Sequence, residues 1–202
     1  MTTAQEPSTP ATRIVIAEDE ALIRLDLAEM LAEEGYDVVG QASDGEQAVA
    51  LVVEHRPDVV LMDIKMPRLD GIEAASRIAE QRLAPVVLLT AFSQRELVDR
   101  ARDAGAMAYL VKPFQKSDLA PAIEMARSRF AEISTLEAEV DDLTERLATR
   151  KAVERAKSVL QESFGITESE AFRWIQKSAM DLRMSMREVA DQVIDKGPGL
   201  NG

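Results

Sequence analysis

The stretch that decides the fold is Val59-Val60-Leu61-Met62-Asp63-Ile64-Lys65-Met66-Pro67, in which four apolar residues lead into a single carboxylate. An unbroken apolar run of this kind predicts a strand that is buried on both faces, as in parallel sheets. The strand would end at Asp63, so the carboxylate would emerge at the edge where open α/β sheets bind their ligands. An aspartate in this position can also simply cap the following loop. The rest of the chain decides between the two interpretations.

Apolar segments of this type alternate with helical patterns over the first 120 residues or so. Strands are expected at residues 13–17, 36–42, 59–63, 85–90 and 106–111, and helices at 21–34, 46–54, 72–80 and 94–103. This alternation predicts an α/β fold, a doubly wound five-stranded parallel sheet with helices on both faces.

The composition predicts the cellular compartment of the protein. The 202 residues include no cysteine, so neither disulfides nor thiolate metal sites are available, and a reducing cytoplasm is expected. Residues 1–12 are expected to form a flexible N-terminus without the apolar core of a signal peptide. No apolar run approaches the roughly 20 residues of a membrane span, so no membrane partner is expected.

Charge is unevenly distributed along the chain. The net charge of −12 argues against nucleic acid as a partner, because a phosphate backbone repels an acidic surface. From Arg146 onward, however, ten Lys and Arg residues face eight Asp and Glu residues. The two halves are therefore electrostatically different, and the second half remains a candidate for binding nucleic acid.

Side chains that can bind a metal or take part in a reaction follow the predicted strands. Glu18 and Asp19 follow the first strand, Asp63 ends the third, Thr90 ends the fourth and Lys112 follows the fifth. Because the strands are parallel, all five side chains should lie on one rim of the sheet. Three carboxylates on one rim repel each other unless a hard divalent cation joins them, and oxygen ligands suit Mg²⁺.

One of these carboxylates can act as a nucleophile toward a phosphoryl group and form an aspartyl phosphate. Mg²⁺ and Lys112 would neutralise the phosphoryl oxygens, and Thr90 could donate a hydrogen bond to the product. The sequence has no Gly-rich phosphate loop, so the site is not expected to hold a nucleotide donor. The single histidine, His55, is expected at the surface and not as a phosphodonor.

Residues 13–125 resemble the flavodoxin-like receiver domain of two-component response regulators. The motifs that carry the resemblance are Glu18-Asp19, Asp63 with Met66-Pro67 and Asp70-Gly71, Thr90-Ala91, and Tyr109 with Lys112-Pro113-Phe114. The resemblance implies a signalling regulator, not an enzyme, that accepts a phosphoryl group on Asp63 from a sensor histidine kinase.

The same resemblance implies how the site is used. Mg²⁺ would be bound by Asp19, by Asp63 and by the backbone carbonyl of Lys65, and Glu18 would act through water. Thr90 and Tyr109 would form a switch pair that responds to the phosphoryl group. Glu18 stands where the family more often has aspartate.

A long helix is expected after Phe114, where the alternation stops. Ser117 is predicted to cap it and Pro121 to fall in its first turn. Four apolar residues follow the a/d spacing of a coiled coil: Leu136, Val140, Leu143 and Leu147. Residues 126–150 are therefore expected to form a coiled-coil linker helix that joins two copies into a homodimer when the protein is active. The same stripe could instead pack within one monomer.

Residues 151–196 predict a small three-helix all-α domain, followed by a flexible tail at 197–202. Thr167 and Glu170 have the spacing of a capping box, and Ser185 is predicted to begin the last helix.

Residues from about 135 to 195 resemble the ANTAR domain, an RNA-binding antiterminator module. The resemblance is carried by Arg155-Ala156-Lys157, Leu160, Glu168, Glu170-Ala171-Phe172, Ala179-Met180 and Val189-Ala190. It implies a transcription antiterminator that binds hairpin loops in nascent transcripts. The candidate phosphate contacts are Arg155, Lys157, Arg173 and Lys177, and the candidate stacking aromatics are Trp174 and Phe172.

An alternative from another class is a protein-interaction output, in which the dimerised helices capture a regulatory protein and touch no RNA. DNA binding is less favoured, because no helix-turn-helix with a basic recognition helix is evident.

Overall fold

The computed structural model describes residues 11–91, 95–197 and 199, and the chain divides into two compact units, Met1–Ser134 and Thr135–Gly202. The flexible ends expected at 1–12 and 197–202 lie largely outside the described residues. The elements are, in order, β1 (Arg13–Ala17), α1 (Ala21–Glu33), β2 (Asp37–Ala42), α2 (Gly45–His55), β3 (Val59–Asp63), α3 (Gly71–Glu80), β4 (Val86–Thr90), α4 (Arg95–Asp103), β5 (Ala108–Val111), α5 (Lys116–Phe164), α6 (Glu168–Leu182) and α7 (Met186–Lys196).

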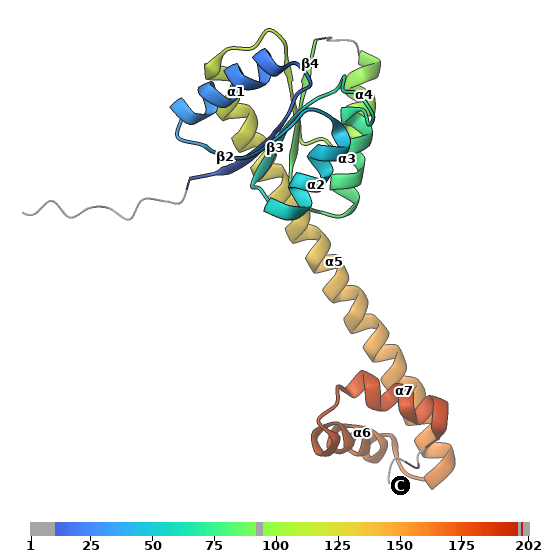
Figure 1. Cartoon of the computed structure of the whole chain (residues 1–202). Helices are drawn as coiled ribbons and strands as arrows, with labels where there is room; N and C mark the ends of the chain where they lie inside the picture. The colour runs from blue at the N-terminus through green and yellow to red at the C-terminus, as the bar shows by residue number, and fades with distance from the viewer. Residues whose placement is uncertain (1–10, 92–94, 198, 200–202) are drawn as a thin grey trace, which may run out of the picture. The chain divides into compact units, whose positions relative to one another are not determined.

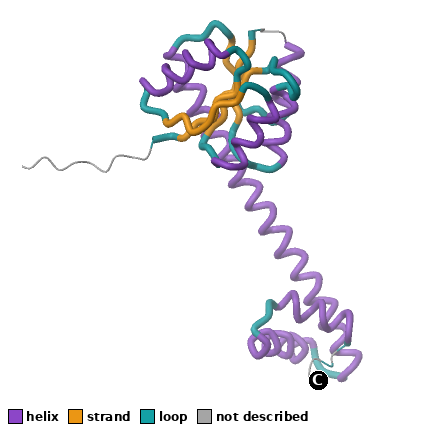
Figure 2. The backbone as a smooth tube through the Cα atoms, viewed as in Figure 1, coloured by secondary structure: helices purple, strands orange, loops and turns teal. Residues whose placement is uncertain are grey.

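The first unit is built on a parallel sheet with the strand order β2-β1-β3-β4-β5 (Figures 1 and 2). This order confirms the predicted doubly wound sheet and is that of flavodoxin-like folds. The strand order reverses between β1 and β3, because β2 is added on one side of β1 and β3 on the other. Such sheets have a crevice at this point, at the carboxyl ends of the strands. In the register, Ala17 pairs with Met62 and Asp63 with Leu89, so the strand ends lie level with one another.

Two apolar layers cover the sheet, one on each face. Val60 and Met62 of β3 pack into a cluster that also contains residues of α2 and α3. Val59 and Leu61 pack into the other cluster, against α1 and the first turns of α5. Figure 1 shows α1 and α5 on one side of the sheet and α2, α3 and α4 on the other. All five residues of β3 are buried, which confirms the interpretation of its unbroken apolar run.

The loop that follows β3 folds back closely on the strand. The Gly71 amide donates to the Ile64 carbonyl at 2.8 Å, which closes the loop over residues 64–71. A Cβ atom at position 71 would overlap the backbone carbonyl oxygen of Asp63. Only glycine fits this approach, so the close contact holds the end of β3 against the start of α3.

The second unit is a small helical core. The C-terminal part of α5 packs with α6 and α7 around Val153, Leu160, Ile175, Val189 and Val193, which confirms the three-helix prediction. Both predicted caps are present. Thr167 and Glu170 form the capping box that begins α6, and Ser185 begins α7 in a second box with Glu188.

The start of α5 differs from the prediction. The helix begins at Lys116, and the Gln115 amide donates to the Asp118 carboxylate at 2.8 Å, so Asp118 and not Ser117 provides the side-chain cap. Pro121 is consequently the sixth residue of the helix and not part of its first turn. Its missing N–H removes one intrahelical hydrogen bond at that point. No helix in the described part of the chain is long and apolar enough to cross a membrane.

Candidate functional site

The carboxyl ends of the strands surround a cavity of about 330 Å³. Its lining residues are Asp19, Glu20, Asp63, Ile64, Lys65, Thr90, Ala91 and Lys112. Asp63 is the last residue of β3 and Thr90 the last of β4, while Asp19 and Lys112 follow β1 and β5. The parallel topology thus brings together side chains that are up to 93 positions apart, from Asp19 to Lys112, as the sequence predicted.

Three carboxylates converge at this rim. Glu18 is completely buried, Asp63 is nearly so, and Asp19 is exposed. One carboxylate oxygen from each of the three lies within 4.8 Å of the other two. Such a set of oxygen donors, at least one of them open to solvent, fits the coordination preference of Mg²⁺.

Lys112 compensates the two buried acids. Its Nζ atom donates to Glu18 Oε2 at 2.6 Å and lies 3.2 Å from Asp63 Oδ1. The backbone amide of Lys112 donates to the Thr90 carbonyl at 2.7 Å, which holds the end of β5 beside the end of β4. The ammonium group is therefore fixed between the two carboxylates.

The local electrostatics follow from burial and from this ion pair. Burial raises the pKa of Asp63 and that of Glu18, and Lys112 opposes both increases without cancelling them. Burial alone would lower the pKa of Lys112, but its hydrogen bond to Glu18 and the charge of Asp63 outweigh burial and raise that pKa. The folded protein therefore favours the charged ammonium group of Lys112 and disfavours the ionised form of Asp63.

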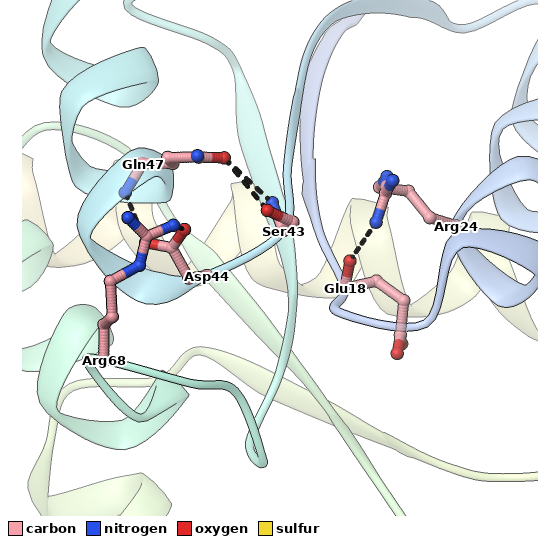
Figure 3. A network of polar contacts seen from close by, with 6 residues as sticks. All are labelled: Glu18, Arg24, Ser43, Asp44, Gln47 and Arg68. Carbon is pink, nitrogen blue, oxygen red and sulfur yellow. Dashed lines mark hydrogen bonds and ion pairs between the residues drawn. The ribbon is translucent and has the colours of Figure 1, made fainter.

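Two arginines outside the cavity contact the loops that border it (Figure 3). Arg24 of α1 donates through Nη1 to the backbone carbonyl of Glu18 at 2.6 Å. Arg68, in the loop between β3 and α3, forms an ion pair with the buried carboxylate of Asp44. Neither arginine was expected at the site from the sequence. The only available signal was Asp44 in the turn before Gly45, a position typical of a helix cap.

Two other sequence-predicted residues lie away from the cavity. Tyr109 of β5 is 49% exposed and lines a separate groove of about 570 Å³ with Val111 and Met125. This conformation therefore does not bring Tyr109 together with Thr90. His55 ends α2 and is half-buried, not fully at the surface as expected, and it does not line the cavity.

The candidate RNA contacts of the second unit fall into two groups. Arg155, Arg173 and Lys177 are exposed. Lys157, by contrast, is buried and forms ion pairs with Glu154 at 2.8 Å and Glu168 at 2.7 Å. Lys157 is therefore corrected from a candidate phosphate contact to an internal ion-pair residue, because its ammonium group is already held by two carboxylates.

The two aromatic candidates are also distinguished by their surroundings. Trp174 is half-buried against the helical core, whereas Phe172 is 42% exposed. Phe172 lines a groove of about 460 Å³ together with Arg146, Arg150 and Met186. Of the two rings, Phe172 is therefore the more exposed.

The four predicted seam residues are exposed in the single chain. Leu136, Val140, Leu143 and Leu147 lie on one stripe of α5, with Leu143 62% exposed. Leaving four large apolar side chains of one stripe in water is unfavourable, so a stripe of this kind marks a surface that another chain can cover.

Comparison with known proteins gives the class of the molecule. Residues 14–124 match the response regulator receiver domain, and residues 141–194 match the ANTAR domain. The chain belongs to the response regulators and combines a receiver domain with an ANTAR domain.

Individual relatives agree with this assignment. The chain is 66% identical over 183 residues to the transcriptional regulatory protein PdtaR of Mycobacterium tuberculosis, which covers 91% of this chain and 89% of that protein. The signal receiver domain of the response regulator NarL from the same species is 30% identical, with a TM-score of 0.56, and the match covers 58% of this chain and 97% of that one. The CheX–CheY–BeF3–Mg²⁺ complex of Borrelia burgdorferi is 28% identical, with a TM-score of 0.53, over 55% of this chain and 86% of that one.

The electrostatics of the cavity lead to a prediction about stability. Because the pKa of Asp63 is raised above its ordinary value of 3.8, the folded state disfavours the ionised carboxylate. We expect Asp63→Asn to increase the free energy of unfolding at neutral pH in Mg²⁺-free buffer. The gain should disappear as the pH falls through the raised pKa, where the wild-type carboxyl group becomes protonated. Urea unfolding between pH 4 and pH 8 measures the difference.

The matched control is Asp37→Asn, which removes an exposed carboxylate at the edge strand β2. An Asp63→Asn variant that is less stable than wild type at neutral pH would contradict the account of the site.

Proposed function

We propose that the protein is a phosphorylation-gated RNA-binding antiterminator whose phosphoryl acceptor is Asp63. The observation that carries the first half is the position of Asp63, which ends a buried strand inside a cavity with Asp19, Thr90 and Lys112 around it. The receiver family implies a histidine kinase as the donor.

In the proposed reaction, an oxygen of Asp63 attacks the phosphorus of a phosphohistidine on the sensor kinase. The bond from phosphorus to the imidazole nitrogen breaks, and the phosphoryl group remains on Asp63. Mg²⁺ held by Asp19, Asp63 and the Lys65 carbonyl, with Glu18 acting through water, would supply positive charge to the phosphoryl oxygens. The complex of the similar CheY protein with BeF3 and Mg²⁺ supports this choice of metal.

Two side chains of this protein would hold the product. Lys112 lies between Glu18 and Asp63, so its ammonium group can contact an added phosphoryl oxygen while it keeps its bond to Glu18. Thr90 is buried at the end of β4 on the same cavity and can donate its hydroxyl to another phosphoryl oxygen. In the switch pair that the family resemblance implies, Tyr109 would move from its exposed position once Thr90 donates to the phosphoryl group.

The second half of the proposal is that the ANTAR unit binds RNA hairpin loops. The basic side chains Arg155, Arg173 and Lys177 are exposed and can contact phosphates, and Phe172 presents a ring on which an unstacked base can lie. The carboxylates of the first unit repel RNA, so phosphorylation would act by changing the access of RNA to the basic surface.

We further propose that the active form is a homodimer joined along α5. Leu136, Val140, Leu143 and Leu147 follow the heptad spacing and are exposed in the single chain. The Phe172 groove includes Arg146 and Thr149, each one or two residues away from Leu147. Because one residue turns a helix by about 100°, these two residues lie on another face of α5 than Leu147. Arg150 and Glu154, which also line the groove, continue the heptad spacing of the stripe, so a dimer along α5 would border the groove on one side.

RNA binding is tested by separating phosphate contacts from base contacts. Lys177→Ala should weaken binding to all hairpins and reduce the slope of log affinity against log salt by about 0.7 to 1. Phe172→Ala should weaken binding by about 5- to 150-fold with the slope unchanged, because one stacked base contributes about 1–3 kcal/mol. Fluorescence titrations of hairpin RNA at several salt concentrations measure both, with and without a small phosphodonor.

Matched controls are Lys196→Ala, an exposed lysine at the end of α7, and Leu182→Ala, whose side chain is 43% exposed. If phosphorylated wild type binds no hairpin loop, the RNA proposal fails and the capture of a regulatory protein becomes the better explanation of the exposed helices.

The dimer is tested by placing charge in the stripe. Leu136→Asp combined with Leu143→Asp should convert the phosphorylated protein from dimer to monomer, since burial of each leucine contributes about 1.5–3 kcal/mol. Met180→Asp, at a position 75% exposed on α6, is the control for an added charge elsewhere. Sedimentation equilibrium measures the mass. A phosphorylated wild type that remains monomeric at high concentration would overturn the dimer.

A further inference from the structure

The loop between β3 and α3 carries part of the candidate site and is attached to the sheet at both ends. Ile64 and Lys65, at its start, line the cavity beside Asp63. At the other end, the Gly71 amide returns to the Ile64 carbonyl at 2.8 Å. The position of the Lys65 carbonyl therefore depends on what holds the middle of this loop.

The middle of the loop is held by a contact with a different part of the chain. Arg68 donates through its guanidinium group to the carboxylate of Asp44, in the loop between β2 and α2 (Figure 3). Beside this ion pair, Leu69 is buried, and its backbone oxygen packs so closely on Gly45 that a Cβ atom there would overlap it. The loop thus rests directly on the first residue of α2.

Asp44 is rigidly placed to receive this contact. Its side chain is fully buried, and its second carboxylate oxygen accepts the Gln47 amide at 3.0 Å as the cap of α2. Ser43 extends the network by donating to the Gln47 side chain at 3.2 Å. A buried carboxylate that is already part of a helix terminus gives the loop a fixed anchor, and it is costly to leave unpaired.

Arg68 adopts an unusual backbone conformation for an arginine. Its φ angle is +66°, in the left-handed region that residues with a side chain seldom occupy. A strained backbone persists only where surrounding contacts determine it, and here the ion pair with Asp44 is such a contact. Without the guanidinium group, the loop would lose the interaction that favours this conformation.

We propose that Arg68 and Asp44 form a latch that positions the Lys65 carbonyl for Mg²⁺ before the metal arrives. Arg68 is a positioning residue, because its guanidinium group is bonded to Asp44 and does not line the cavity. The inference rests on the proposed function, in which Mg²⁺ binds at Asp19, Asp63 and Lys65. A preorganised ligand binds a metal more tightly, because the loop does not have to be ordered upon binding.

The first measurement needs no metal. In Mg²⁺-free protein, hydrogen exchange of the amides of Lys65, Met66, Arg68 and Leu69 should be faster in Arg68→Ala than in wild type. The matched control is Arg56→Ala, which removes an exposed arginine that is also left-handed, with φ +46°, from the connection between α2 and β3. Unchanged exchange in Arg68→Ala would overturn the latch.

The second measurement is Mg²⁺ affinity by titration calorimetry. Arg68→Ala should bind Mg²⁺ about tenfold more weakly, equivalent to about 1.4 kcal/mol, and Arg56→Ala should bind like wild type. Arg68→Lys should recover part of the affinity because it keeps a cation beside Asp44. Equal affinities in Arg68→Ala and Arg56→Ala would contradict the proposal.

A double variant separates positioning from stability. Arg68→Ala leaves a buried carboxylate without its cation and can unfold part of the protein for that reason alone. Adding Asp44→Asn removes the charge and keeps an oxygen for the α2 cap. The double variant should regain thermal stability but keep the weak Mg²⁺ affinity and the fast exchange. Recovery of all three would show that Arg68 only balances charge.

If wild type itself binds no Mg²⁺, the proposed function fails, and so does the part of this inference that concerns Mg²⁺ affinity. The exchange measurement still decides whether the latch exists.

Discussion

The site depends on one ammonium group between two buried carboxylates. Burying an ionised carboxylate costs several kcal/mol, and Glu18 and Asp63 are both withdrawn from solvent. Lys112 Nζ lies 2.6 Å from one and 3.2 Å from the other, and its own backbone is bonded to β4. The compensation is incomplete, because the pKa of both acids stays raised. The cavity therefore retains excess negative charge, which a hard cation or the protonation of a carboxylate can neutralise.

The sheet topology makes this arrangement possible. Glu18 and Lys112 are bonded although 94 positions separate them, because β1 and β5 both point their carboxyl ends to the same rim. The close approach of Gly71 to the Asp63 carbonyl holds the end of β3 against the start of α3. Function in this unit thus follows from strand order and from a few close contacts, and the helices mainly cover the apolar faces of the sheet.

Much of this was accessible from the sequence, because periodicity and strand ends are local signals. The apolar run before Asp63, the alternation of strands and helices, and the convergence of the acids were all predictable. What failed depended on contacts between distant segments. Arg68 was missed because its partner Asp44 is 24 positions away and its left-handed backbone has no signal in the sequence. Lys157 was misjudged because its ion pair with Glu168 joins α5 to α6, a contact that the chain forms only when the helices pack. The switch pair of Thr90 and Tyr109 stays a prediction, with Tyr109 exposed in this conformation.

The most direct test of the account is the phosphorylation of Asp63 itself. The full-length protein is incubated with a small phosphodonor and Mg²⁺, and its intact mass is followed with time, with the modified residue located by peptide mapping. The account predicts a gain of one phosphoryl group on Asp63 that requires Mg²⁺, is lost when the metal is chelated, and is absent in Asp63→Asn. Phosphoryl incorporation into Asp63→Asn at the wild-type rate would contradict it.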